Sequence, residues 1–274
     1  MRKIIPAVFM LFFAAAVFGQ TGLEIIVEDN DEGLTIIRSS GSAQTLIIPD
    51  TIDGKPITVI GSGAFTNKGL TELTIPDSVT EIGDSAFSFN MLQTVSIGNN
   101  VVSIGQGAFT GNKLSSVTLG ESVVRIGKGA FSDNALVSIT IPGSVSVIDD
   151  YAFFSNKIRE ITFPASVETI GEGAFSGNRL VSVVIGDGVT RIGDGAFYNN
   201  RITGVTLPES LETLGKRVFD TRPAGGRIPG NINYTDQSGN VLYTTANNFD
   251  TFYASNGKKP GTYTLSSGVW ALNQ

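Results

Sequence analysis

The most regular feature of the sequence is a phenylalanine that returns every 22 residues. Apolar residues recur at fixed offsets after each of these phenylalanines, at five, eight, ten, fourteen and seventeen positions, with polar residues between them. Eight occurrences without an insertion indicate a repeat architecture in which each unit stacks on the next. The eight are Phe65, Phe87, Phe109, Phe131, Phe153, Phe175, Phe197 and Phe219.

The offsets within one unit predict two short extended segments. In the unit after Phe131, Ile139 and Ile141 alternate with polar residues, as in a half-buried strand. Pro142 follows, and this position is always Pro or Gly, which ends the strand. Val145 and Ile148 then mark a second short strand. No window of the repeats has helical periodicity, so the pattern predicts a β-rich solenoid of 22-residue coils.

A single coil offers about seven inward apolar groups and cannot close a core alone, whereas stacked coils bury them continuously. Six coils also carry an asparagine three residues after the phenylalanine. We interpret this row as structural, because a stacked amide satisfies backbone groups left unpaired by a tight turn. The alternative is an amide row that binds a ligand. These residues are Asn90, Asn112, Asn134, Asn156, Asn178 and Asn200.

The pattern divides the chain into four parts: a signal peptide (1–19), an N-terminal cap with a first irregular coil (20–56), the solenoid (57–220) and an aromatic-rich C-terminal module (221–274). We expect a hairpin cap from 23–27 and 34–37, because an open solenoid end exposes both core and strand edge. Five extra residues around Gly54 predict an inserted turn in the first coil.

The C-terminal module begins where the period breaks after Phe219. Residues 222–230 contain two Pro and three Gly, a composition typical of an irregular linker. Residues 261–270 predict a hairpin with a Ser-Ser-Gly turn, so we expect a small β module. It either caps the solenoid or serves attachment and partner binding.

Composition narrows the chemistry. The chain has no Cys and no His, which excludes disulfides, Cys/His zinc sites and Ser-His-Asp triads. We therefore predict no enzymatic activity and no cofactor. Without Arg2 and Lys3, 17 basic residues stand against 25 acidic ones. Such an acidic chain lacks the basic surface that nucleic-acid binding requires.

The first residues predict export. Arg2 and Lys3 precede an apolar run over 4–18, and the small Gly19 follows, which is the pattern of a cleaved signal peptide. The run is short for a membrane span, which needs about 20 apolar residues. We expect an exported protein at the cell surface, associated with the outer membrane or secreted, with no transmembrane anchor in the mature chain.

Residues at the same offset in neighbouring coils form surface rows about 5 Å apart. The outward strand positions form a threonine-rich face. Either partners bind to this face, or its composition reflects only the strand propensity of threonine. A basic ridge is a candidate contact for an acidic partner, and three acids are candidate Ca²⁺ ligands unless they are an ordinary solvated edge. The candidates are Thr118, Thr140 and Thr162; Lys157, Arg179 and Arg201; and Asp150, Glu172 and Asp194.

The repeated unit resembles the leucine-rich repeats of BspA-like bacterial surface proteins. The resemblance rests on segments such as Leu136-Val-Ser-Ile-Thr-Ile-Pro and Ile104-Gly-Gln-Gly-Ala-Phe109, and covers about residues 44–220. It implies adhesion to host extracellular matrix or to another bacterial surface protein. A self-associating scaffold of the cell envelope is the alternative. Asp149 replaces a repeat glycine before Tyr151, which suggests a local change of turn.

Overall fold

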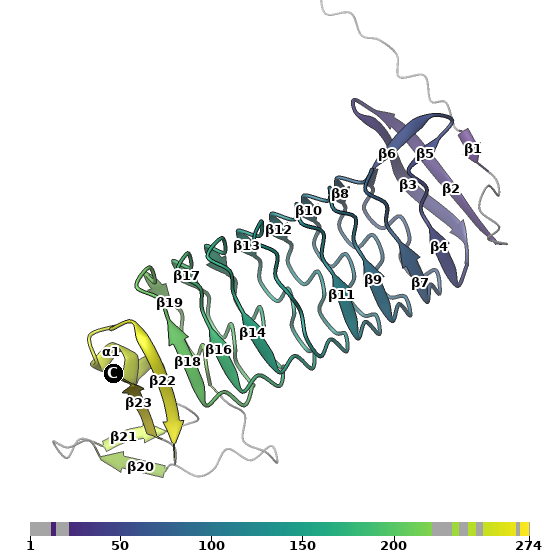
Figure 1. The fold of residues 1–274 in the computed structure, drawn as a ribbon. Helices are drawn as coiled ribbons and strands as arrows, with labels where there is room; N and C mark the ends of the chain where they lie inside the picture. Colours follow the sequence, from purple (N-terminus) through teal and green to yellow (C-terminus); the bar gives the residue numbers. More distant parts are fainter. Residues whose placement is uncertain are drawn as a thin grey trace, which may run out of the picture.

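A computed structural model describes residues 22–220, 249–266 and 269–273, together with the backbone of 12–14, 232–235 and 241–244. The chain winds into an elongated stack of coils (Figure 1). This confirms the predicted solenoid. We number the coils by their phenylalanines, from coil one at Phe65 to coil eight at Phe219, and each coil includes the short strand before its phenylalanine.

One side of the stack is a parallel ladder of very short strands. Each strand brings an inward isoleucine or leucine into register with the same residue of the next coil, as in Ile104 opposite Ile126. The ladder continues the strands of the N-terminal cap. Its members are β6 (Lys55–Ile60), β8 (Glu81–Ile82), β10 (Ser103–Ile104), β12 (Arg125–Ile126), β13 (Val147–Ile148), β15 (Thr169–Ile170), β17 (Arg191–Ile192) and β19 (Thr213–Leu214).

The second side carries the longer strands, in two separate ladders. In both, the middle residue of a strand points inward and its neighbours point to solvent, as the alternation predicts. The first ladder contains β4 (Thr45–Ile47), β7 (Glu72–Thr74), β9 (Thr94–Ser96) and β11 (Ser116–Thr118). The second contains β14 (Glu160–Thr162), β16 (Ser182–Val184), β18 (Gly204–Leu207), β22 (Gly261–Ser266) and β23 (Val269–Asn273).

The core is a column of stacked phenylalanine rings. All eight repeat phenylalanines are fully buried. Successive ring centroids lie 5.1–5.6 Å apart, with the ring planes within 16° of parallel. The 22-residue period therefore sets one ring per coil, and an insertion would move a ring out of the column.

The asparagine row connects each coil to the one before it. Asn156 Nδ2 donates to the carbonyl of Phe131 at 2.9 Å and to that of Phe153 at 3.2 Å, and its Oδ1 accepts from the N–H of Leu136 at 3.0 Å. Most members of the row are buried. The structural interpretation of the row is confirmed, because these amides satisfy backbone groups that no strand pairs.

The N-terminal end is closed by the expected hairpin. Strands β2 (Leu23–Asn30) and β3 (Gly33–Gly41) pair antiparallel, and β3 pairs parallel with β6. The inserted turn is also present: β5 (Thr51–Ile52) pairs with β6, and Asp53 and Gly54 have φ of 51° and 78°. A positive φ favours glycine, so Gly54 suits this turn.

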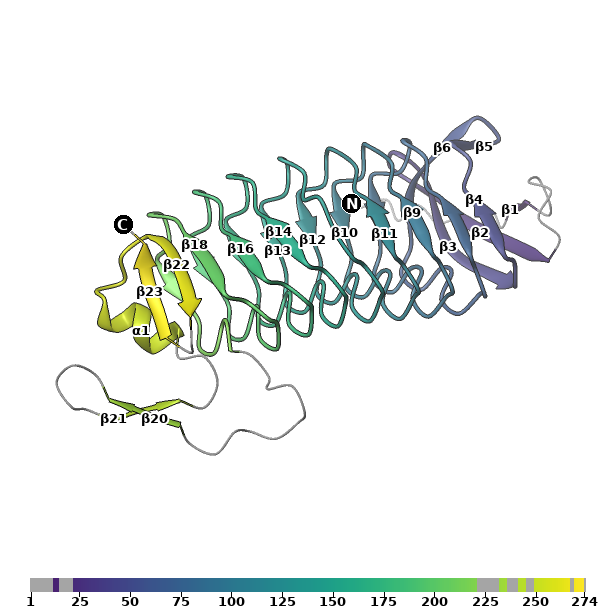
Figure 2. The same cartoon turned by 60° about the horizontal axis from the view of Figure 1, so that its bottom comes forward.

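Residues 249–266 and 269–273 pack on the last two coils (Figure 2). Strands β22 and β23 form the predicted hairpin, and β22 pairs antiparallel with β18. Helix α1 (Phe249–Ser255) was not predicted from the sequence. Its Phe249 ring lies edge-on to Phe219, with centroids 4.8 Å apart. The signal was the spacing of Phe249, Phe252 and Tyr253, which share one helical face.

Some expectations concern residues beyond those described. The linker at 222–230 lies outside the described residues, as does the predicted signal peptide apart from the backbone of 12–14. That backbone forms β1 (Phe12–Ala14), which pairs antiparallel with β2. Strands β20 (Ile232–Thr235) and β21 (Val241–Thr244) form a separate pair.

Candidate functional site

The strand face is a row of small hydroxyl-bearing side chains. Thr118, Thr140 and Thr162 are all exposed in three consecutive coils. Their exposure follows from the alternation, because the residues on either side of each point into the core. The face is uncharged at these positions, so it provides hydrogen-bonding groups over a long surface without strong electrostatic attraction.

A groove opens on this face where the two strand ladders are interrupted. Residues 138–140 of coil four form no strand, so β11 and β14 have no strand between them. The groove has a volume of about 500 Å³. Thr118 and Thr140 border it, whereas Thr162 does not. The sequence analysis missed it, because coil four keeps the repeat pattern. Its lining is Val117, Thr118, Leu119, Glu121, Thr140, Pro142, Gly143 and Ser144.

The basic ridge lies along a different row, just beyond the buried asparagines. Lys157, Arg179 and Arg201 are exposed. The backbone N–H of Arg179 donates to Ile158 and that of Arg201 to Leu180, both at 2.9 Å, which places the three residues on successive coils. Within the described chain, none of the three has a carboxylate oxygen within 4.0 Å. The ridge is therefore an uncompensated run of positive charge.

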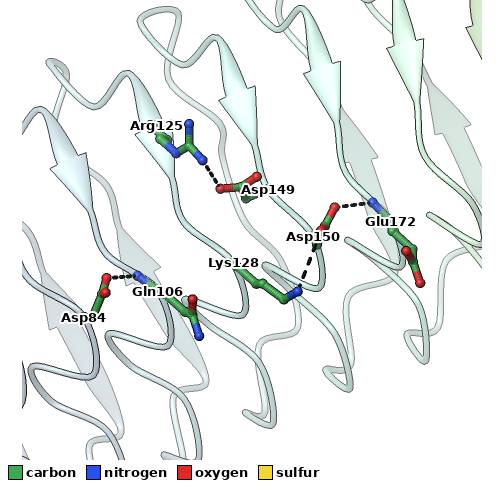
Figure 3. Close-up of polar contacts among 7 residues, drawn as sticks. All are labelled: Asp84, Gln106, Arg125, Lys128, Asp149, Asp150 and Glu172. Atoms are coloured by element: carbon green, nitrogen blue, oxygen red, sulfur yellow. Dashed lines mark hydrogen bonds and ion pairs between the residues drawn. The ribbon is translucent and has the colours of Figure 1, made fainter.

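The acidic row lies at the start of the turn in each coil, and Asp84 and Asp150 reach toward the backbone of the next coil (Figure 3). Asp84 accepts a hydrogen bond from the N–H of Gln106 at 2.7 Å, and Asp150 accepts one from the N–H of Glu172 at 2.9 Å. Asp194 does the same for Lys216. These aspartates stabilise the next coil. Among the residues that the structure describes, no group of three or more acids is placed to hold a metal ion.

Asp149 and Tyr151 of coil five depart from the repeat through their side chains. Elsewhere the position of Asp149 is glycine; a Cβ on Gly105, for example, would lie 2.6 Å from the N atom of Asp84. Tyr151 has a φ of 56°, close to the 57° of Gly173. The N–H of Asp149 donates to the Ile126 carbonyl at 2.9 Å, as the N–H of Gly127 does to that of Ile104 at 2.8 Å. The backbone turn therefore matches the other coils, and the suggested change of turn is not present.

These two departures bring charged and aromatic side chains together, and Figure 3 shows the charged ones. Arg125 pairs with Asp149 at 2.5 Å, and Lys128 with Asp150 at 3.9 Å. The Lys128 ammonium also lies 5.8 Å from the centroid of the Tyr151 ring. The sequence analysis noticed Asp149 and Tyr151 but not this cluster, because the partners come from the preceding coil.

The Tyr151 hydroxyl connects the cluster to coil six. It donates a hydrogen bond to the Glu172 carboxylate. That bond raises the pKa of Tyr151, with smaller contributions from burial and from the negative charges of Glu172 and Asp150. A raised pKa keeps the phenol protonated, so at neutral pH it acts as a hydrogen-bond donor.

The family follows from this repeat. A model of the BspA type leucine rich repeat region matches residues 38–159 and 146–246, with six copies. The chain therefore belongs to the BspA-type leucine-rich-repeat family, which confirms the resemblance seen in the sequence. No curated protein matches the chain in sequence.

Solved structures of bacterial leucine-rich-repeat proteins share the fold. A leucine-rich repeat protein from Bacteroides ovatus is 28% identical with a TM-score of 0.61, over 71% of this chain and 54% of that one. The T. pallidum leucine rich repeat protein is 25% identical with a TM-score of 0.52, over 74% and 87%. The pneumococcal vaccine antigen PcpA is 20% identical with a TM-score of 0.55, over 73% and 66%. This chain thus spans about half of the Bacteroides ovatus protein.

The exposed rows present groups that can hydrogen-bond or pair with charges. The chain has no His or Cys, and the exposed rows contain hydroxyls, ammonium and guanidinium groups, and carboxylates used by backbone N–H groups. In the described part of the chain, no helix is long and apolar enough to cross a membrane. The family and the stacked coils give the chain a long regular surface.

Proposed function

We propose that this chain is an exported, adhesin-like protein that binds protein partners through the strand face of its solenoid. The observation that carries the proposal is the exposed threonine row, with the groove between Thr118 and Thr140. A partner of this chemistry is a host extracellular-matrix protein or another bacterial surface protein. The binding requires no cofactor and no catalysis.

The composition of the strand face determines the kind of binding. Threonine and serine are uncommon among interface residues that contribute most of the binding energy, whereas Tyr, Trp and Arg are frequent. A contact along the threonine row is therefore weak for each coil and gains affinity by extending over several coils. The groove adds a local concavity to this face.

The basic ridge is a second contact surface, for an acidic partner. Lys157, Arg179 and Arg201 present three unpaired positive charges on successive coils. Charges of this kind accelerate association and confer salt sensitivity more than they add affinity. The ridge lies on a different row from the threonines, so substitutions can separate the two surfaces.

The proposed location is the cell surface, the outer membrane or the medium. It is supported by the predicted signal peptide (1–19) and by the BspA-type leucine-rich-repeat family. Fractionation of cells that express the chain with a C-terminal tag tests it. Recovery of the protein only from the cytoplasm would contradict export.

The binding proposal is tested with the chain lacking residues 1–19 and a panel of immobilised matrix proteins. The strand-face variant carries Thr118→Lys, Thr140→Lys and Thr162→Lys. The matched control carries Ser62→Lys, Asn99→Lys and Thr213→Lys, which adds the same charge at exposed positions elsewhere. We expect saturable binding by the parent and the control, and at least a tenfold loss for the strand-face variant.

Two outcomes would contradict the strand-face proposal. Equal binding by the two variants would exclude the threonine row as the contact surface. Absence of binding by the parent chain, together with self-association that depends on concentration, would favour the alternative of an envelope scaffold. A chain ending near Phe219 would show in addition whether the C-terminal residues contribute to the contact.

A further inference from the structure

Coils five, six and seven carry two rows of opposite charge, one on each side of the turn that contains the phenylalanine. In each of these coils, an acid precedes a base by seven residues. The acids, which we call the acidic stripe, are Asp150, Glu172 and Asp194; the bases are the basic ridge of Lys157, Arg179 and Arg201. All are exposed except Asp150, which is partly exposed.

Among coils one to seven, only coils five to seven have both an acid and a base at these two positions. The same two positions hold Ser62 and Gly69 in coil one and Asp84 and Met91 in coil two. They hold Gln106 and Lys113 in coil three, and Lys128 and Ala135 in coil four. The inward positions are the same in all these coils, so core packing does not require three consecutive acid–base pairs.

The two rows do not neutralise each other within the chain. The residues of the basic ridge have no carboxylate oxygen within 4.0 Å in the described chain. On the acidic side, Oδ1 of Asp194 accepts the N–H of Lys216, which fixes the carboxylate at the surface. Asp150 lies 3.9 Å from Lys128, and Glu172 accepts a hydrogen bond from the Tyr151 hydroxyl. Asp150 is thus the one member of the stripe with a cation within 4.0 Å in the described chain, and that cation does not come from the basic ridge. The charges of the basic ridge, Glu172 and Asp194 remain available to a partner.

Aromatic side chains occupy the turn between the rows. Phe154 is 36% exposed, and the Tyr151 ring packs edge-on to it, with centroids 6.0 Å apart. Tyr198 lies two coils further along, with the Arg217 guanidinium 4.8 Å from its ring centroid. Tyr151 keeps a positive φ at a position that is glycine in the neighbouring coils.

We propose that this turn edge binds a second copy of the same chain. A two-fold axis parallel to the solenoid axis places the acidic stripe of one copy against the basic ridge of the other, and the reverse. Both rows repeat once per coil at about 5 Å, so all three coils match at once. Tyr151, Phe154 and Tyr198 then lie near the axis, where an interface needs aromatic contacts.

The charge pattern favours a second copy over other partners. Nucleic acid or an anionic polysaccharide would be attracted by the basic ridge but repelled by the acidic stripe. A second copy matches both rows in number, sign and spacing. Exposed ion pairs each contribute little and are screened by salt, so the dimer should be weak and sensitive to salt. The inference rests on the proposed role of the basic ridge as a contact for an acidic partner.

The test is sedimentation of the chain lacking residues 1–19, over a range of concentrations, at about 0.05 M and about 0.5 M NaCl. One variant carries Lys157→Glu, Arg179→Glu and Arg201→Glu. A second carries Asp150→Asn, Glu172→Lys and Asp194→Asn, which keeps the acceptors used by backbone N–H groups. The control carries Arg38→Glu, Arg191→Glu and Lys259→Glu, all at exposed positions.

We expect the parent and the control to dimerise at low salt and to dissociate at high salt. Each interface variant alone should be monomeric, with a melting temperature near that of the parent. An equimolar mixture of the two variants should form a heterodimer, because each supplies the charge that the other lacks. A monomeric parent at low salt, or dimers that survive both sets of substitutions, would overturn the proposal.

This outcome is independent of the strand-face test. Dimerisation is measured without any partner protein, and the strand-face variant leaves both charged rows intact. A monomeric chain that still binds matrix proteins through Thr118, Thr140 and Thr162 would leave the proposed function standing and remove the dimer. A chain that dimerises but does not bind matrix proteins would support the dimer and exclude the strand-face contact.

Discussion

Coils two to four and coils five to seven are alike inside and different outside. Phe87 and Phe109 stack with centroids 5.3 Å apart, and Phe153 and Phe175 do so at 5.1 Å. Outside, coil two exposes Phe89 and Met91, at 62% and 43%. Coils five to seven carry acids and bases in separate rows. Stacking therefore constrains the inward positions of every coil and leaves the outward ones free to differ.

Stacking constrains the inward positions more than the surface, because inward side chains are packed against their equivalents in neighbouring coils. An inward side chain contacts equivalent side chains in the coils before and after it, so a change of volume disturbs three coils. An outward side chain contacts mainly solvent, and surface substitutions usually change stability by less than about 0.5 kcal/mol. Three predictions test this difference between inside and outside.

The largest effect is expected in the ring column. Phe131→Ala should lower the free energy of unfolding by about 3–5 kcal/mol, because it removes a buried ring between two stacked rings. Denaturant unfolding measures the change, and Phe89→Ala, at an exposed position, serves as the control. Equal and small effects for the two variants would show that the ring column does not carry the core.

A smaller loss is expected in the asparagine row. Asn156→Ala should cost about 1–3 kcal/mol, because the carbonyls of Phe131 and Phe153 and the N–H of Leu136 lose a buried partner. Asn100→Ala is the matched control, since Asn100 is exposed and donates only to the carbonyl of Asp77. Thermal unfolding of both variants should show a clear loss only for Asn156; similar melting temperatures would argue against the ladder.

The smallest effect is expected at the surface of coil five, and in the opposite direction. Tyr151→Gly should raise stability by about 1 kcal/mol, because glycine adopts a positive φ without the steric cost that tyrosine bears. Tyr198→Gly is the control, because Tyr198 does not have a positive φ. This variant should be neutral or destabilising. A clear loss of stability for Tyr151→Gly would mean that the Glu172 and Lys128 contacts outweigh the backbone strain.

Much of the fold was predictable because repetition supplies many tests of one pattern. Each inward position is sampled seven or eight times, so the phenylalanine and asparagine rows stand out against single exceptions. The ends are sampled once. The N-terminal hairpin was still visible from alternation around Gly33. Helix α1 was missed, because three aromatic residues on seven positions are a weak signal in a tail rich in aromatics.

The binding surfaces were predictable only in part. The threonine row and the basic ridge follow from the period, and the structure exposes both. The groove at Thr118 and Thr140 could not be predicted from the period, because coil four keeps the pattern although its residues 138–140 form no strand. The Arg125–Asp149 and Lys128–Asp150 pairs depend on which outward side chains reach across to the next coil.

The sequence by itself determined the repeat, the inward positions and the absence of cysteine and histidine chemistry. These follow from residue identity and spacing, which stacking converts directly into a buried column. Only the tertiary structure decided that Phe249 lies on Phe219, that β22 pairs with β18 and that a groove separates β11 from β14. Those contacts join residues outside the 22-residue period, so no local pattern specifies them.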